Sequence, residues 1–337
     1  MRTCAIMLTI GTTLALQTPT LTLPGTLDQM PIVGYGTWLA AAGDVYQGTK
    51  AAIAQGYRHI DEAWIYENER EVGQAIKEAC AEGTIKSRDD LWITSKLWQC
   101  YHRPELVREG CLDSMAQLGV DVLDLYLIHF PIAFVPGCKE AVSENQMEDV
   151  PIGDTWRAME KLVDEGLVKN IGVSNFEIDD LKAVRAVATK PIAVNQFETH
   201  PFYQRHELLD YCQSHGIVVT AHSSMGGGAN AMKAFHASPP LTEEPVLLEI
   251  ARKHATTVQA VMLAWGVQRP TAVIPKSISP TRIAANLEAT LSLTLDADDL
   301  VAIATLDKPG LEGCYCHPKT PWLGRSKFTG STDHYYG

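Results

Sequence analysis

Short apolar runs rich in β-branched residues recur along the chain, and longer amphipathic stretches separate them. Nearly continuous hydrophobicity over a few residues is typical of strands that are buried on both faces of a parallel sheet. The pattern predicts eight such strands, at residues 32–36, 57–61, 91–96, 122–129, 170–175, 192–196, 217–222 and 271–276.

The stretches between these runs place apolar side chains at helical spacing. Val72, Ile76 and Ala79, for example, would share one face of a helix. Asp154 is expected to cap a helix further along, and Gly166 is expected to end it. Besides that helix, the pattern predicts helices at residues 68–82, 103–118, 179–187, 206–214, 246–254, 257–266, 280–289 and 297–305.

The repeated alternation of strands and helices, without a break between halves, predicts an α/β fold of the parallel (β/α)8 type, a TIM barrel. We expect residues 20–337 to form one barrel domain that ends in a C-terminal tail. Two connections, 130–151 and 223–244, are unusually long for loops without secondary structure, and such loops are usually functional. Residues 1–19 are treated as an N-terminal extension, either a signal or transit segment or a loosely packed one.

Composition narrows the classes of protein that fit. Of 337 residues, 46% are hydrophobic and 20% are charged, which is ordinary for a globular protein and excludes a mostly disordered chain. The 28 basic and 40 acidic residues give a net charge of −12, which argues against nucleic acid or an anionic membrane as a partner. The eight cysteines are too irregular for a disulfide scaffold, so a reducing, cytoplasmic location is favoured, and Cys314 and Cys316 are expected to be free thiols.

The residues that end the predicted strands carry the candidate chemistry. Asp61, Lys96 and His129 end three consecutive strands, and a barrel brings all strand ends to one rim. Tyr66 follows Asp61 by five residues. An ammonium group beside a phenol stabilises the phenolate and lowers the pKa of the phenol, which could then deliver a proton to a developing alkoxide. The set predicts reversible carbonyl reduction, with chance capping of strands by polar residues as the alternative.

The hydride source is indicated by other strand ends. No Gly-x-Gly-x-x-Gly follows a strand, which disfavours a Rossmann site. Asn175 and Gln196 carry amides that could bind a carboxamide such as that of nicotinamide. Lys276, Ser277 and Arg282 surround a predicted helix start, and this combination suits a phosphate such as the 2′-phosphate of NADPH. Solvated surface charge is the alternative reading of the two cations.

Several short motifs follow one another along the chain: MP at 30–31, GYGTW at 34–38, GYRHID at 56–61, TSKLW at 94–98, GVSNF at 172–176 and IPKS at 274–277. In this order they resemble the motifs of the aldo-keto reductases, over nearly all of residues 20–325. The sequence around HFPIAF at 129–134 and VPI at 150–152 is most similar to that of xylose-reductase-like and aldose reductase members. The family likewise implies a (β/α)8 barrel and reduction of an aldehyde or aldose carbonyl.

The resemblance also assigns roles to residues. It implies a catalytic tetrad of Asp61, Tyr66, Lys96 and His129, in which Tyr66 is the general acid. It implies a small-molecule aldehyde or sugar substrate, no metal, and NADPH as cofactor, with NADH left open. The chain is expected to be a monomer or a homodimer, and the sequence does not decide between them. The implied cofactor-binding residues are Gly36, Thr37, Ser174, Asn175, Gln196, His222, Ser223, Lys276, Ser277, Arg282 and Asn286. The implied substrate pocket consists of Trp38, Trp64, Phe130 and Trp322.

Two positions depart from the family pattern. His222 stands where the family usually stacks a tyrosine on the nicotinamide ring, and a protonated imidazole there would repel the oxidised ring. Ala285 stands where a glutamate commonly faces the adenine, which blurs the preference between NADPH and NADH. A cofactor-binding sensor or structural barrel without turnover is the alternative function. A metal-dependent hydrolase is disfavoured, because Lys96 would repel a cation.

Overall fold

The strands form a parallel barrel whose order follows the chain. The computed structural model describes residues 18–139, 144–226, 240–310 and 312–316. The sheet has eight strands in the order β12-β11-β10-β9-β6-β5-β4-β3. Their bounds are β3 Tyr35–Gly36, β4 His59–Asp61, β5 Trp92–Leu97, β6 Leu123–Ile128, β9 Val168–Ser174, β10 Val194–Glu198, β11 Val218–His222 and β12 Thr271–Val273.

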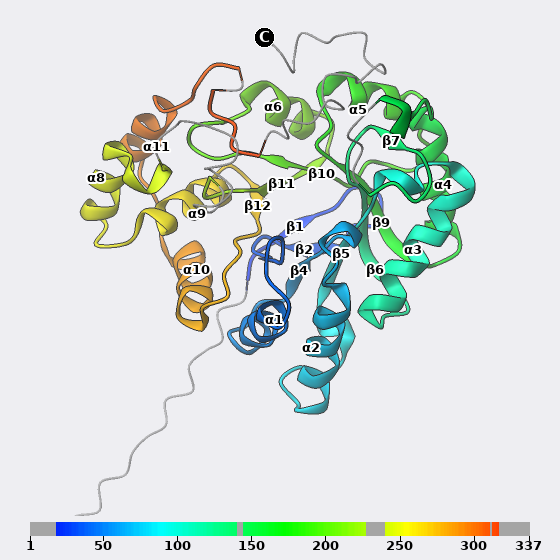
Figure 1. Ribbon diagram of the computed structural model, residues 1–337. Coiled ribbons are helices and arrows are strands. Elements are labelled where there is room, and N and C mark those ends of the chain that lie inside the picture. The colour runs from blue at the N-terminus through cyan, green and yellow to red at the C-terminus, as the bar shows by residue number, and fades with distance from the viewer. Residues whose placement is uncertain (1–17, 140–143, 227–239, 311, 317–337) are drawn as a thin grey trace, which may run out of the picture.

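The two edge strands meet and close the sheet. Val33 forms a parallel bridge with Val273. The Val273 N–H donates to the Ile32 carbonyl at 2.9 Å, and the Gly34 N–H donates to the Val273 carbonyl at 2.8 Å. Closure satisfies backbone groups that an open sheet would leave unpaired. Helices surround the strands (Figure 1), so the predicted (β/α)8 fold is confirmed.

One helix of the barrel was not predicted. The helix α1 (Asp44–Ala54) contains Gly48 in its middle, which weakens both its propensity and its apolar pattern. That glycine is required, because a Cβ there would lie 2.1 Å from the hydroxyl of buried Tyr35. The other α-helices in the described parts of the chain are α2 Glu69–Ala81, α3 Pro104–Leu118, α4 Ile152–Asp164, α5 Ile178–Arg185, α6 His206–Ser214, α8 Pro245–Lys253, α9 Val258–Gln268, α10 Pro280–Ser292 and α11 Ala297–Ala304.

Two expectations for the segment before and within α4 were wrong. Asp154 does not cap the helix, because α4 already begins after Pro151, and Asp154 pairs with Arg157 in the first turn. Gly166 does follow the helix end, with φ of +73°. The long connection 130–151 contains secondary structure, contrary to expectation. In it β7 (Ala133–Phe134) pairs with β8 (Met147–Glu148), and the short helix η4 (Glu144–Gln146) directly precedes β8. Most of the second long connection lies outside the described residues, and it ends in η5 (Leu241–Glu243).

An N-terminal hairpin, which was also not predicted, packs at the end of the barrel where β9 begins. It consists of β1 (Thr20–Thr22) and β2 (Gln29–Pro31). The side chain of Asn170 binds its turn, with 2.7 Å to the Thr26 hydroxyl and 2.8 Å to the Asp28 carboxylate. The strand ends at the opposite rim therefore remain for the candidate site. Within the described residues no helix has the length and apolarity to cross a membrane.

Candidate active site

The acid, the ammonium and the phenol predicted from the strand ends meet at one rim of the barrel. Lys96, on β5, is fully buried, and its Nζ donates to Oδ1 of Asp61 at 2.6 Å and to the Glu62 carbonyl at 2.9 Å. The same Nζ lies 3.3 Å from the Tyr66 hydroxyl. Tyr66 ends a short helix, η1 (Trp64–Tyr66), directly after β4. One ammonium therefore contacts both a carboxylate and a phenol.

The expected direction of the tyrosine pKa was wrong. Burial raises the pKa of Tyr66 to about 12, although the charge of Lys96 acts to lower it. Desolvation disfavours the phenolate more strongly than one ammonium stabilises it, because Asp61 offsets part of the lysine charge. The hydroxyl is therefore protonated at neutral pH, which is the form that an acid needs before it donates a proton.

His129 lies across from this phenol as a neutral imidazole. The rings of His129 and Tyr66 meet edge to face, with centroids 5.9 Å apart. Burial, together with the nearby charge of Lys96, lowers the pKa of His129 well below its usual value. Its Nδ1 is buried and has no hydrogen-bond partner among the described residues. A neutral ring can offer one N–H to a carbonyl oxygen at the mouth.

The amide-bearing residues lie beside this set. Nε2 of Gln196 donates to Oδ2 of Asp61 at 2.6 Å, and the Ser174 hydroxyl donates to the Gln196 carbonyl at 2.8 Å. Asn175 adopts a left-handed conformation, with φ of +60°, and its Oδ1 lies 2.9 Å from Nε2 of His222. Donors and acceptors of this kind, grouped at one rim, fit a carboxamide.

His222 does not carry the charge that its sequence position allowed. Burial lowers the pKa of its imidazole to about 4, so the ring is neutral at neutral pH. Nδ1 of His222 lies 3.1 Å from Oγ of Ser223, and that hydroxyl lies 2.9 Å from Sγ of Cys316. A neutral imidazole at this place would not repel an oxidised nicotinamide ring.

Two cations gather where α10 begins. Nε of Arg282 donates to the Ser277 hydroxyl at 3.3 Å, and Nζ of Lys276 donates to the Leu39 carbonyl at 3.1 Å. Burial and the charge of Arg282 lower the pKa of Lys276. Neither cation forms an ion pair with a carboxylate in the part of the chain that the structure describes. Asn286 follows one turn later and is partly exposed. This group fits a phosphate at a helix N-terminus.

Gly36 and Thr37 pack tightly against the same rim. A Cβ on Gly36 would lie 2.6 Å from the Ile274 carbonyl, so the close approach of the two strands requires glycine. The buried Thr37 hydroxyl donates to the backbone carbonyl of Asp61 at 2.8 Å, and its own carbonyl accepts from Asn68 at 3.2 Å. In these contacts Thr37 supports the end of β4.

Three of the four predicted pocket residues are described. Trp38 is 41% exposed. Nε1 of Trp64 donates to the Asp113 carboxylate at 2.6 Å, which fixes the indole. Phe130 stacks on His129, with centroids 5.2 Å apart. Trp322 lies outside the described residues.

Sequence reasoning missed Glu198, because β10 continues two residues past Gln196. Its buried carboxylate accepts from the N–H groups of Tyr315 and Cys316 at 2.6 and 3.0 Å, and from the Cys314 thiol at 2.9 Å. Burial opposes ionisation, yet the hydrogen bonds from His200 and from the Cys314 thiol lower the pKa of Glu198 to about 2. The signal that could have identified Glu198 is its acidic side chain, two residues beyond the predicted end of the strand. Glu62, which is buried and whose backbone carbonyl accepts from Nζ of Lys96, was also missed.

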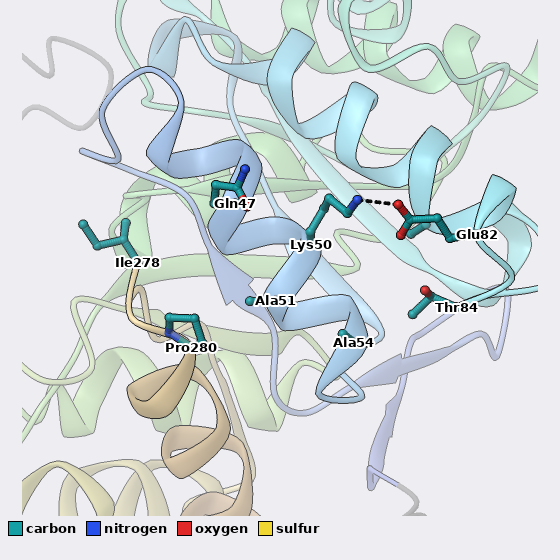
Figure 2. Close-up of a pocket in the computed structure, with 9 residues that line it drawn as sticks. Gln47, Lys50, Ala51, Ala54, Glu82, Thr84, Ile278 and Pro280 are labelled. Atoms are coloured by element: carbon teal, nitrogen blue, oxygen red, sulfur yellow. Dashed lines mark hydrogen bonds and ion pairs between the residues drawn. The ribbon is translucent and has the colours of Figure 1, made fainter.

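A separate surface groove of about 380 Å³ lies between α1, α2 and the start of α10 (Figure 2). Lys50 crosses it to Glu82, with 2.7 Å between Nζ and Oε1, and also contacts Glu78 at 3.2 Å. The ammonium of Lys50 is already paired, and none of the candidate catalytic residues lines the groove. The groove is therefore not the candidate active site.

Comparison with known proteins places this geometry in a family. The model of the "Aldo/keto reductase family" matches residues 33–308. An aldo/keto reductase of Synechocystis is 41% identical over 286 residues, which cover 83% of this chain and 86% of that protein. The rat aldo-keto reductase family 1 member A1 is 39% identical over a match that covers 83% of this chain and 87% of that protein. The structure of the aldose reductase from Schistosoma japonicum superposes with a TM-score of 0.78 at 36% identity. The superposition covers 86% of this chain and 93% of that chain.

Proposed function

The chain belongs to the aldo/keto reductase family, and from this premise we propose that it reduces the carbonyl group of an aldehyde or aldose to the alcohol, with Tyr66 as the proton donor. The observation that carries the proposal is the contact of one buried ammonium, Lys96, with both Asp61 and Tyr66. When bound, a nicotinamide cofactor supplies the hydride.

Residues of this chain have separate roles in the transfer of the proton. Asp61 keeps Lys96 charged and in place, because a buried ammonium without a counter-charge would lose its proton. Lys96 then stabilises the negative charge that forms on Tyr66 as its proton leaves. His129, as a neutral donor, orients the carbonyl oxygen toward the phenol. General acid catalysis of this kind contributes about 10²–10⁴-fold in rate.

We propose NADPH as the preferred cofactor. Lys276, Ser277 and Arg282 supply two cations and a hydroxyl beside a helix start, which suits the extra phosphate of NADPH. Ser174, Asn175 and Gln196 would bind the carboxamide, with His222 against the ring. The names of the relatives support an aldose or a generic aldehyde as the substrate.

The test is the variant Tyr66→Phe, assayed by NADPH absorbance with a panel of aldehydes and aldoses. We expect turnover to fall by about 10²-fold or more, while cofactor affinity, measured by protein fluorescence, stays unchanged. Tyr211→Phe on α6, whose hydroxyl contacts Arg185, is the matched control and should keep full activity. Undiminished turnover in Tyr66→Phe would refute the role. A wild-type chain that binds NADPH but reduces no carbonyl would favour the sensor.

A further inference from the structure

Two carboxyl groups, of Glu62 and Glu69, are buried beside the lysine of the candidate active site. Glu62 directly follows Asp61, and Glu69 is the first residue of α2. Both residues are 0% exposed. Within the described residues neither side chain forms an ion pair with a cation. Burial of an unpaired carboxylate is costly, so these groups favour the protonated form.

Each of the two acids adjoins Lys96 by a different route. The backbone carbonyl of Glu62 accepts from Nζ of Lys96 at 2.9 Å, and its Oε2 accepts from the Ala63 N–H at 3.3 Å. Oε1 of Glu69 accepts from the hydroxyl of Ser95, the residue before Lys96, at 2.5 Å. The remaining oxygens, Oε1 of Glu62 and Oε2 of Glu69, are buried and have no partner among the described residues.

Burial raises the affinity of both acids for protons, and Glu69 also acts on Glu62. Burial, and then the like charge of Glu69, raise the pKa of Glu62 well above its usual value. Burial raises the pKa of Glu69 to about 7. Both carboxyl groups therefore lose their protons less readily than an exposed glutamate does.

Four elements place titratable groups against Glu62. They are Glu69 from α2, Lys96 from β5, Tyr35 from β3 and Tyr66 from η1, and the charge of Glu62 acts on both tyrosines. When Glu62 loses its proton, its negative charge raises the pKa of Tyr66 and stabilises the charge on Lys96. The effect of Glu62 on Tyr66 therefore grows as the pH rises, which is also the direction in which the phenol would lose its proton.

We propose that Glu62 is a positioning residue for the proton donor: its carboxyl group is buried beside Lys96, as is that of Glu69, and its negative charge, when present, keeps Tyr66 protonated. This inference rests on the proposed function, since it assigns Tyr66 as the acid. It predicts that the chain reduces carbonyls further into the alkaline range than Asp61 and Lys96 alone would allow.

The first test compares the pH profile of kcat for wild type and Glu62→Gln with NADPH and one aldehyde. In the isosteric amide variant we expect the alkaline limb to move to lower pH by about half a unit or more, because a charge near Tyr66 is lost. Glu62→Asp keeps a carboxyl group and is the matched control, with a limb close to that of wild type. A limb that stays in place in Glu62→Gln, or that moves equally in both variants, overturns the proposal.

The second test does not depend on turnover. Infrared difference spectra at neutral pH, wild type minus Glu62→Gln, should contain the C=O band of a protonated carboxyl group, and this band should disappear as the pH is raised. Its absence at neutral pH overturns the proposal. If the wild-type chain reduces no carbonyl, the proposed function fails while this band still reports on Glu62. If it reduces carbonyls and both readouts are unchanged by Glu62→Gln, only the present inference fails.

Discussion

Asp61 uses its two carboxylate oxygens for two different elements of the barrel mouth. Oδ1 accepts from Nζ of Lys96 and Oδ2 accepts from Nε2 of Gln196, both at 2.6 Å. The proposed proton-transfer set and the proposed carboxamide-binding set therefore share one carboxylate. Through this shared carboxylate, the binding of a cofactor amide and the charge of the lysine can be coupled, although 135 residues separate Asp61 from Gln196.

The first prediction concerns the ion pair itself. Asp61→Asn keeps the shape of the side chain but leaves Lys96 buried without a counter-charge, since the two side chains are 2% and 0% exposed. We expect the free energy of unfolding to fall by about 3–5 kcal/mol, and carbonyl reduction to be largely lost. Denaturant titration measures the first effect. Asp154→Asn, in an exposed pair with Arg157, should change stability by no more than about 1 kcal/mol. Equal losses in both variants would contradict the assignment.

The second prediction concerns the choice of cofactor. Arg282→Ala removes a guanidinium next to Ser277 while the rest of α10 stays in place. Charged hydrogen bonds contribute about 1.5–3 kcal/mol, so NADPH binding should weaken roughly tenfold to a hundredfold, while NADH binding barely changes. Fluorescence titration with both nucleotides measures the difference. Arg252→Ala on α8, which removes an exposed arginine paired with Glu249, is the control. An equal loss for NADPH and NADH would argue against a 2′-phosphate site.

The strand ends could be predicted from the sequence because they depend on local pattern. A buried parallel strand is a short apolar run, and the first polar residue after it lies at the rim, as Asp61 and His129 do. The helix α1 was missed because Gly48 interrupts its pattern, and the reason for that glycine is the Tyr35 hydroxyl. The cause lies in tertiary packing, which local periodicity does not record.

Protonation states and the contacts of Glu198 were beyond sequence reasoning for a related reason. The pKa of Tyr66 depends on the balance between burial and the charges of Lys96 and Asp61, and a residue pattern does not give this balance. Glu198 meets Cys314 and Cys316 across 116 and 118 residues of chain. The pairing is specific, but no spacing rule connects such distant positions.

The third prediction tests whether Glu198 holds the segment around Tyr315 on the barrel. Glu198→Gln replaces a buried carboxylate that accepts two backbone N–H groups, of Tyr315 and Cys316. Loss of charge-assisted hydrogen bonds should speed amide exchange at these two residues by about tenfold or more. It should also raise the KM for aldehydes, because Cys316 contacts Ser223 at the mouth.

Hydrogen exchange with mass spectrometry or NMR measures the effect of that substitution. Glu249→Gln on α8, in an exposed pair with Arg252, is the matched control and should leave the exchange of Tyr315 and Cys316 unchanged. Unchanged exchange of the Tyr315 and Cys316 amides in Glu198→Gln would show that the carboxylate does not hold this segment.

The last prediction concerns stability in acid. Burial lowers the pKa of His102 to about 3 from an ordinary value of 6.5, and its Nε2 has no partner among the described residues. Between these two values the unfolded chain binds a proton that the folded chain does not, so stability is lost as the pH falls below about 6.5. Between pH 7 and pH 5, this one residue should lower the free energy of unfolding by about 2 kcal/mol.

Other buried groups act in the opposite direction, so the comparison must isolate His102. Burial raises the pKa of both Glu69 and Asp180 to about 7, and these carboxyl groups make the folded state less stable as the pH rises from about 4 to 7. His102→Asn leaves their contribution in place and removes only that of the imidazole. The stability of this variant should therefore fall less between pH 7 and pH 5 than that of wild type, by about 2 kcal/mol, while exposed His215→Asn should follow wild type. Parallel pH curves for wild type and His102→Asn would mean that His102 becomes protonated without unfolding, and that burial does not keep it neutral.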